Sequence, residues 1–303
     1  MTIRPEPGRE DQIMAKPSRT DTPSLADLRR DIDRIDEAMH RLLMERGEII
    51  DRLIAIKQTQ EVGSAFRPAR EAEMMRRLVE RHHGILPLDT AESIWRVLIG
   101  TFTFVQSPYA VHADLSAGEP AMRASARFHF GFTVPFVTHM SPAATVAAVA
   151  ASKGDLGLVP ASAVAGTGAW WAALEDEAAP KIIARLPFVE RGDHPAGLPV
   201  FVVSRSAPDA MVPDVETWSV RVAGWGSAVA RAISPLAEIV AVPDRTLEGA
   251  ALLVSVPNGK TFADIQRALI EAGASVRSTA LVGSHATRYT VSPNGTRPVA
   301  TGH

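Results

Sequence analysis

Apolar residues recur every three or four positions along residues 25–57. The series consists of Leu25, Leu28, Ile32, Ile35, Met39, Leu42, Ile49, Leu53 and Ile56. This spacing predicts a long amphipathic helix whose apolar stripe packs on other helices. Arg46 occupies one position of the stripe, where an apolar residue is expected. Because a buried guanidinium is costly unless it is paired, we expect a carboxylate of the protein or an anionic ligand to bind it.

The ends of this helix are indicated by the residues that flank the stripe. Ser24 is a favourable N-cap, and Glu61-Val62-Gly63-Ser64 breaks the pattern, so the helix is expected to end near residue 60. Its length is roughly 50 Å at 1.5 Å per residue. Two short helices alone cannot cover a stripe of that length, and we therefore expect this helix to pair with a second subunit.

Two further helices are predicted before residue 110. Pro68 suits the first turn of the second helix, and Gly84 is a good residue to follow its end. Asp89 and Glu92 have the spacing of an N-cap and capping-box pair for the third helix. Pro108 is expected to end that helix.

After residue 110 the pattern changes to short Val-rich runs that alternate with Ala-rich helical segments. Residues 156–160 and 200–203 read as strands, and Ser141-Pro142 opens a helix. Residues 216–291 predict the order βαββαβ of a ferredoxin-like unit. The fold class is therefore a multi-domain α plus α/β protein. Its expected parts are a disordered arm (1–23), a helical domain (24–108), an α/β domain (112–205), a ferredoxin-like domain (216–292) and a tail (293–303).

Composition narrows the classes of function. The chain has 303 residues, of which 46% are hydrophobic and 22% charged, as in a globular protein. A net charge of −2 argues against nucleic-acid binding, and the absence of cysteine excludes disulfides and thiolate-bound metals. No stretch resembles a signal peptide or a membrane span, so we expect a cytoplasmic protein.

Charged residues at particular helix positions suggest a binding site. Arg46 and Lys57 are eleven residues apart, which places them on one helix face about 16 Å apart along the axis. Arg29 lies about 100° round the helix from Arg46, so only a second copy of the helix could bring it to the same point. Arg70-Glu71 opens the second helix and Gln106 closes the third. These residue types include no nucleophile–base pair and no metal-ligand set, and they suit a small dianion with a hydroxyl group.

Residues 24–106 resemble the all-helical chorismate mutases. The resemblance rests on the order and approximate spacing of Leu28-Arg29-Arg30, Ile35-Asp36, Leu42-Leu43-Met44-Glu45-Arg46, Ala55-Ile56-Lys57, Pro68-Ala69-Arg70-Glu71 and Gln106. It implies a three-helix domain that forms an intertwined homodimer, and it implies rearrangement of chorismate to prephenate in aromatic amino acid biosynthesis.

The resemblance also implies a role for each charged position. Arg46 and the partner subunit's Arg29 would hold the two carboxylates of chorismate. Lys57 and Gln106 would contact the ether oxygen whose bond breaks. Glu71 would bind the ring hydroxyl, and Arg70 would help to fix that end of the substrate. No cofactor and no metal are implied.

Two positions depart from the family pattern, and they leave other functions open. Arg67 stands where an acidic residue is common, and Phe102 stands where a small hydroxyl residue is common. Both bear on recognition of the hydroxyl end. An isochorismate–pyruvate lyase shares the fold and the cationic pocket, and is one alternative. A regulatory protein that binds an aromatic metabolite without turnover is the other.

The second half shows a weaker resemblance to prephenate dehydratases. It rests on Gly154-Asp155-Leu156-Gly157-Leu158-Val159-Pro160 followed by Gly166. The catalytic signatures are replaced, by Ala161-Ser162-Ala163 and by Leu198-Pro199-Val200-Phe201. Gly224-Trp225-Gly226 is only a partial dinucleotide fingerprint. We therefore expect a catalytically inactive region with a structural or regulatory role, and no bound cofactor.

Overall fold

The computed structural model describes residues 23–57, 65–205, 214–244 and 248–291. The chain divides into two units, residues 1–49 and 50–303. Helix α1 (Leu25–Lys57) runs through this division. The expected arm up to residue 22, the break at residues 61–64 and the tail at residues 293–303 lie outside the described residues.

Helix α1 has nearly the bounds that its sequence predicts, because its first turn is capped as expected. The hydroxyl of Ser24 accepts a 3.2 Å hydrogen bond from the backbone N–H of Asp27, whose carboxylate accepts one of 3.0 Å from the N–H of Ser24. The stripe lies on the surface of the single chain. Eight of its side chains are 46–67% exposed, namely Leu25, Leu28, Ile32, Ile35, Met39, Leu42, Ile49 and Ile56.

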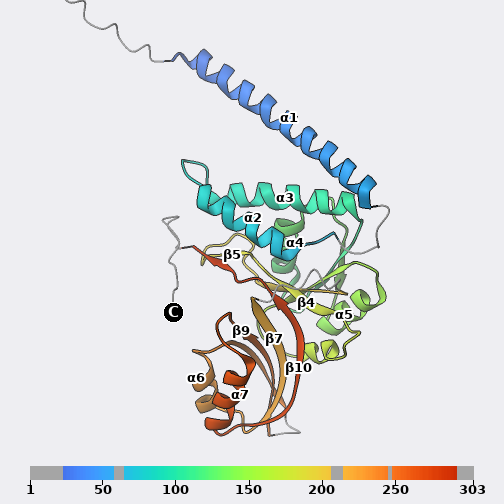
Figure 1. Cartoon of the computed structure of the whole chain (residues 1–303), viewed down its shortest axis with the longest axis vertical. Helices are drawn as coiled ribbons and strands as arrows, with labels where there is room; N and C mark the ends of the chain where they lie inside the picture. The colour runs from blue at the N-terminus through green and yellow to red at the C-terminus, as the bar shows by residue number, and fades with distance from the viewer. Residues whose placement is uncertain (1–22, 58–64, 206–213, 245–247, 292–303) are drawn as a thin grey trace, which may run out of the picture. The chain divides into compact units, whose positions relative to one another are not determined.

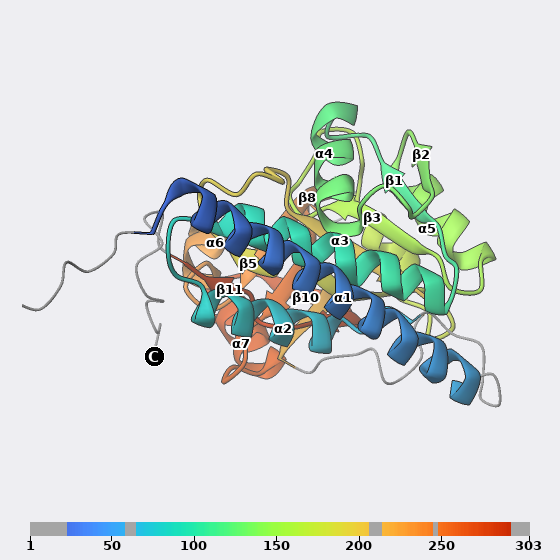
Figure 2. The same ribbon diagram turned by 90° about the horizontal axis from the view of Figure 1, so that it is seen from above.

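Helices α2 (Pro68–Arg81) and α3 (Leu88–Gln106) lie side by side, as Figure 1 and Figure 2 show. Pro68 occupies the first turn of α2, as predicted. The predicted capping box of α3 is wrong, because the N-cap is Pro87 and makes no side-chain hydrogen bond. Asp89 instead accepts from the adjacent N–H of Thr90 (2.9 Å), and Glu92 is buried in the core.

Within the described ranges, nine strands form one sheet in the order β2-β1-β3-β6-β4-β10-β7-β9-β8. Their bounds are β1 Val111–Asp114, β2 Phe136–His139, β3 Leu156–Pro160, β4 Lys181–Leu186, β6 Val200–Ser204, β7 Val215–Ala223, β8 Glu238–Asp244, β9 Gly249–Val256 and β10 Ser275–His285. Strands β1, β2 and β3 are parallel, and β6 is antiparallel to both β3 and β4. Two short strands, β5 (Val189–Glu190) and β11 (Tyr289–Thr290), form a separate parallel pair.

The helices that accompany the sheet in the described part of the chain are α4 (Glu119–Phe130), α5 (Pro142–Ala151), the 3-10 helix η1 (Trp170–Leu174), α6 (Ser227–Ile233) and α7 (Phe262–Glu271). Ser141 caps α5 as the sequence predicts, and accepts a 3.2 Å hydrogen bond from the N–H of Ala144. Thr261 and Asp264 form a complete capping box at α7. None of the described helices is long and apolar enough to cross a membrane.

The last third of the described chain has the element order that the sequence predicts. It runs β7, α6, β8, β9, α7, β10, and its strands lie in the order β10-β7-β9-β8 with every neighbouring pair antiparallel. Strand β10 also pairs with β4 at one position, Gly283 opposite Ile182. This pairing joins the segment to the rest of the sheet.

The hydrophobic cores do not divide at residues 108–112, where the sequence pattern changes. Met75 of α2 and Ile99 of α3 share a core with Val111, Leu158 and Val202 of the strands. Within this packing, a Cβ on Gly100 would lie 3.1 Å from the carbonyl oxygen of Phe130. Helices α3 and α4 therefore approach closely, and α2 and α3 are part of the α/β body.

Candidate active site

Three of the predicted site residues lie on α1. The helix is continuous over Leu25–Lys57, so the rise of about 16 Å between Arg46 and Lys57 is the one expected. Arg29 is exposed, and Arg46 is partly buried and makes polar contacts of its own. Arg29 and Arg46 belong to the first unit, and Lys57 belongs to the second.

The other three lie at the ends of α2 and α3. Arg70 and Glu71 are in the first turn of α2, where Arg70 is exposed and Glu71 is buried. Gln106 is the last residue of α3 and is partly buried. Its Nε2 donates a 3.0 Å hydrogen bond to the carbonyl of Phe102 in the same helix. The amide nitrogen has a second hydrogen, which it can donate to a ligand.

Glu71 has a partner that the sequence analysis missed. Nη1 of Arg96, on α3, donates a 2.7 Å hydrogen bond to Oε2 of Glu71. The two residues are 1% and 4% exposed, respectively. Burial raises the pKa of the Glu71 carboxyl, while the charge and hydrogen bond of Arg96 oppose that rise. In the single chain this carboxylate is held by the protein.

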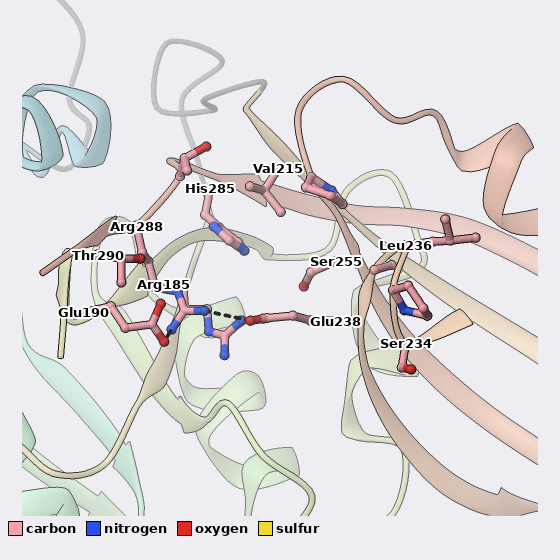
Figure 3. A pocket seen from close by; sticks show the side chains of 14 residues that line it. Arg185, Glu190, Val215, Ser234, Leu236, Glu238, Ser255, His285, Arg288 and Thr290 are labelled. Atoms are coloured by element: carbon pink, nitrogen blue, oxygen red, sulfur yellow. Dashed lines mark hydrogen bonds and ion pairs between the residues drawn. The ribbon is translucent and has the colours of Figure 1, made fainter. Parts of the chain in front are cut away.

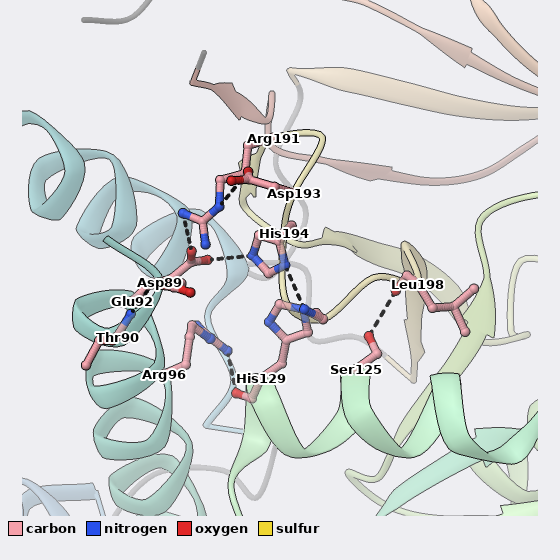
Figure 4. A network of polar contacts seen from close by, with 11 residues as sticks. Asp89, Thr90, Glu92, Arg96, Ser125, His129, Arg191, Asp193, His194 and Leu198 are labelled. Atoms are coloured by element: carbon pink, nitrogen blue, oxygen red, sulfur yellow. Dashed lines mark hydrogen bonds and ion pairs between the residues drawn. The ribbon is translucent and has the colours of Figure 1, made fainter. Parts of the chain in front are cut away.

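Arg96 belongs to a wider buried network, drawn in Figure 4. Its Nη2 donates a 3.0 Å hydrogen bond to the carbonyl of His129 on α4. One turn before it, Glu92 is fully buried and lies 3.2 Å from Nε2 of His194 and 3.6 Å from Nη1 of Arg191. These contacts join α3 to α4 and to the loop that contains His194, and so fix the helix that ends at Gln106.

A sequence signal for this network exists. Glu92, Arg96, Ile99 and Thr103 repeat at helical spacing, and the structure buries all of them on one face of α3. By contrast, Ile94 and other apolar residues of α3 (Trp95 and Val105) are exposed. Glu92 and Arg96 therefore indicate the buried face of α3 together with Ile99, whereas Ile94, Trp95 and Val105 do not.

His129 stands out within the network. Both ring nitrogens are buried, and neither has a hydrogen-bond partner among the described residues. The ring stacks on that of His194, with centroids 6.0 Å apart. Burial first, and then the charges of Arg96 and His194, hold the pKa of His129 well below its usual value. The imidazole is therefore neutral at neutral pH.

The described residues contain no group of three or more His, Asp or Glu placed to hold a metal ion. The predicted site itself consists of cationic side chains, one amide and the carboxylate of Glu71. They can bind anionic and hydroxyl groups and stabilise developing negative charge, and they include no nucleophile–base pair.

Comparison with known proteins places the helical segment in a family. Residues 28–107 match the family model described as chorismate mutase type II, so this segment is a chorismate mutase type II domain. A curated relative, the bifunctional chorismate mutase/prephenate dehydratase of Aquifex aeolicus (strain VF5), is 29% identical over 144 residues. That match covers 45% of this chain and 38% of the Aquifex protein, so the chain matches less than half of its relative's length.

A solved structure described as GqqA, a novel type of quorum quenching acylase, also matches. The match has a TM-score of 0.39 and 16% sequence identity, and it covers 62% of this chain and 98% of that one. At this level the likeness carries no argument about function.

Proposed function

We propose that this chain, whose residues 28–107 form a chorismate mutase type II domain, converts chorismate to prephenate. The observation that carries the proposal is that the matched segment contains the whole predicted site, namely Arg29, Arg46, Lys57, Arg70, Glu71 and Gln106. The Aquifex relative, which carries this activity in its name, supports the same conclusion.

The residue types suit the reaction. In the rearrangement the ether C–O bond breaks as a C–C bond forms within one molecule, and no proton has to move. The protein has to hold the compact conformer and stabilise negative charge on the ether oxygen. We assign the carboxylates to Arg46 and the partner subunit's Arg29, and the ether oxygen to Lys57 and Gln106. A cation and an amide donor are sufficient polar equipment for that oxygen.

We propose that the active enzyme is a homodimer formed through α1. The support is the exposed apolar stripe of this helix, eight side chains that are 46–67% exposed in the single chain. Exposed apolar stripes of this length mark interaction surfaces. A second copy of α1 is the simplest partner, because it would cover the stripe and bring a second Arg29 beside Arg46.

The hydroxyl end of the substrate is assigned to Arg70 and Glu71. Arg70 is exposed at the start of α2 and is available to a ligand. Glu71 is paired with Arg96 at 2.7 Å, so it binds the hydroxyl only if it shares or leaves that partner. A variant at Glu71 therefore tests most directly whether this residue binds the substrate hydroxyl.

We propose that the region after residue 110 is not a working prephenate dehydratase. Ala161-Ser162-Ala163 replaces the Glu-Asn-Ser run of that family, and Ser162 and Ala163 are exposed at the end of β3. The βαββαβ order of β7 to β10 supports a ferredoxin-like unit, similar in element order to a regulatory ACT domain. A structural or regulatory role is the proposal for this half.

The experiment is turnover by the purified full chain. Chorismate and isochorismate are supplied separately, and prephenate, pyruvate and phenylpyruvate are measured at neutral pH. We expect prephenate from chorismate, no phenylpyruvate above the spontaneous rate, and little pyruvate from isochorismate.

Each other outcome identifies a different function. Faster release of pyruvate from isochorismate would make the protein a lyase. A folded, dimeric chain with no turnover of either compound would make it a binding protein. Phenylpyruvate formation would overturn the assignment of the second half alone. Arg34→Ala is a matched control for the site variants, because Arg34 is an exposed arginine of the same helix.

A further inference from the structure

A cavity of about 350 Å³ lies where β4, β5 and β8 meet the end of β10. Its charged and imidazole side chains are those of Arg185, Glu190, Glu238, His285 and Arg288, which Figure 3 shows gathered round one space. The volume is within the range of small-molecule sites. None of these residues belongs to the proposed mutase site.

Two arginines share one acidic partner in this cavity. The carboxylate of Glu238 contacts Nη1 of Arg185 through one oxygen and Nη2 of Arg288, at 2.7 Å, through the other. Both arginine side chains are only 12% exposed. Burial, and then the charge of Arg288, lower the pKa of Arg185 to about 10. Two convergent guanidinium groups favour a carboxylate between them.

Glu238 is suited to being displaced. Its side chain is 54% exposed, although it bridges two largely buried arginines. Glu190 separately pairs with Arg288. If Glu238 turns outward, two cations and the carboxylate of Glu190 remain, with a net charge of about +1. This net charge favours binding of one negative charge at the position that the Glu238 carboxylate now occupies.

His285 provides a hydrogen-bond acceptor in this cavity. It is 2% exposed, and its Nδ1 lies 2.9 Å from the carbonyl of Ala286. A carbonyl can only accept, so Nδ1 carries the proton. Burial lowers the pKa of His285 to about 4, so the ring is neutral and Nε2 has a free lone pair. Nε2 is buried and has no partner among the described residues. Figure 3 shows the ring directed into the cavity.

The rest of the wall is mixed. Ser234, Ser255, Thr287 and Thr290 contribute hydroxyl groups, and the apolar part consists of Val215, Pro235, Leu236, Ala237 and Pro257. A second cavity of about 650 Å³ adjoins this one and shares Arg185 and Glu238 with it. A ligand larger than its charged group therefore finds apolar contact and space beside the arginines.

We propose that this cavity binds a small monocarboxylate that carries a hydroxyl group on an apolar body. The ligand carboxylate replaces that of Glu238 between Arg185 and Arg288. Its hydroxyl donates to Nε2 of His285, and its body lies against the apolar part of the wall. The inference does not depend on the mutase activity, because it uses residues from a different part of the chain.

The test compares two probes that differ only in the hydroxyl, 3-phenyllactate and 3-phenylpropionate, by calorimetry on the full chain. We expect 3-phenyllactate to bind roughly 5–10-fold more tightly, the value of one hydrogen bond to a buried acceptor. His285→Phe should bring the two affinities together. Arg288→Gln should weaken both probes at least tenfold, whereas Arg277→Gln, at an exposed arginine of β10, should change neither.

Glu238→Gln makes the test independent of folding defects in the buried positions, because Glu238 is more than half exposed. Without a competing carboxylate, this variant should bind 3-phenyllactate several-fold more tightly than the parent. Three results would overturn the proposal: no binding of either probe to the folded parent and to Glu238→Gln, equal affinity for the two probes in the parent, or equal competition by inorganic phosphate. None of them bears on chorismate turnover.

Discussion

Nη1 of Arg96 and Oε2 of Glu71 form a 2.7 Å ion pair inside the core that α2 and α3 share with the sheet. The pair is 25 residues apart in the chain, and Arg96 also holds the carbonyl of His129. Through these two hydrogen bonds, the side chain of Arg96 connects the start of α2, the middle of α3 and the end of α4. It also occupies the carboxylate that the family resemblance assigns to substrate.

Arg96→Met tests the structural part of this connection. Removing the cation leaves a buried carboxylate unpaired, which costs about 3–5 kcal/mol of stability. Without Arg96 the pKa of Glu71 should rise further, so the folded variant takes up a proton that the unfolded chain releases. Its stability should therefore fall as pH rises above about 4.5, and chemical denaturation at pH 5 and pH 8 would measure this. Arg77→Met, at an exposed arginine of α2, is the control.

Glu71→Gln separates the structural role from a role in binding. If Glu71 contacts the substrate hydroxyl, the variant's KM for chorismate should rise by several-fold beyond any effect of lost stability. If Glu71 only pairs with Arg96, KM should stay at the parent value while the midpoint of denaturation falls. Steady-state kinetics well below the melting temperature distinguish the two outcomes.

Arg46→Ala should abolish most of the activity. The loss of a charge-assisted contact to a substrate carboxylate should raise the activation free energy that corresponds to kcat/KM by roughly 2–5 kcal/mol. Because Arg46 also makes contacts within the chain, the midpoint of denaturation is measured beside kcat/KM, so that lost stability is separated from lost substrate binding. Arg34→Ala should retain the activity of the parent. Near-normal turnover by Arg46→Ala would show that the site is elsewhere.

Gln106→Glu should make the reaction depend on pH. An ionised carboxylate at this position repels the negative charge that develops on the ether oxygen, whereas a protonated one donates a hydrogen bond. The rate of the variant should therefore rise as pH falls, while the parent stays comparatively flat. A variant profile parallel to that of the parent would mean that Gln106 does not touch the reacting oxygen.

The stability of the parent should fall in mild acid because of His285. Its pKa is about 4 in the folded chain against 6.5 for an ordinary histidine, so the unfolded state binds the proton first as pH falls. The stabilisation is complete above about pH 6.5, and at most about 3 kcal/mol is lost as pH falls to 4. His129, whose pKa is also lowered by burial, adds in the same direction. Denaturation between pH 4 and 7.5 should show a flatter curve for His285→Gln than for the parent.

Local features of the fold could be predicted from the sequence, because each depends on residues close together in the chain. The stripe and Ser24 placed α1, Pro68 placed the start of α2, and Ser141 placed α5. The capping box predicted at Asp89 and Glu92 failed because Glu92 has a partner 102 residues away, His194. Local spacing carries no information about such a contact.

The same distinction between local and long-range contacts applies to the candidate sites. Helical phase alone predicted the relation of Arg46 to Lys57 on α1, since both lie on one regular element. The arginine cluster at Arg185 and Arg288 could not be predicted, because it forms only where β8 returns to β4 across the sheet order. Glu238, which joins the two arginines, is the first residue of β8 and is separated from Arg185 by three intervening strands.

The most direct test of the proposed shared chorismate site is complementation between two inactive variants. Arg29→Ala and Arg46→Ala are purified separately, mixed in equal amounts under conditions that exchange subunits, and assayed for prephenate formation from chorismate. Because each mixed dimer contains one site with neither substitution, the mixture should recover about one quarter of the parent activity. The absence of recovery, despite exchange shown by mass spectrometry of differently tagged subunits, would contradict a site built from Arg29 of one subunit and Arg46 of the other.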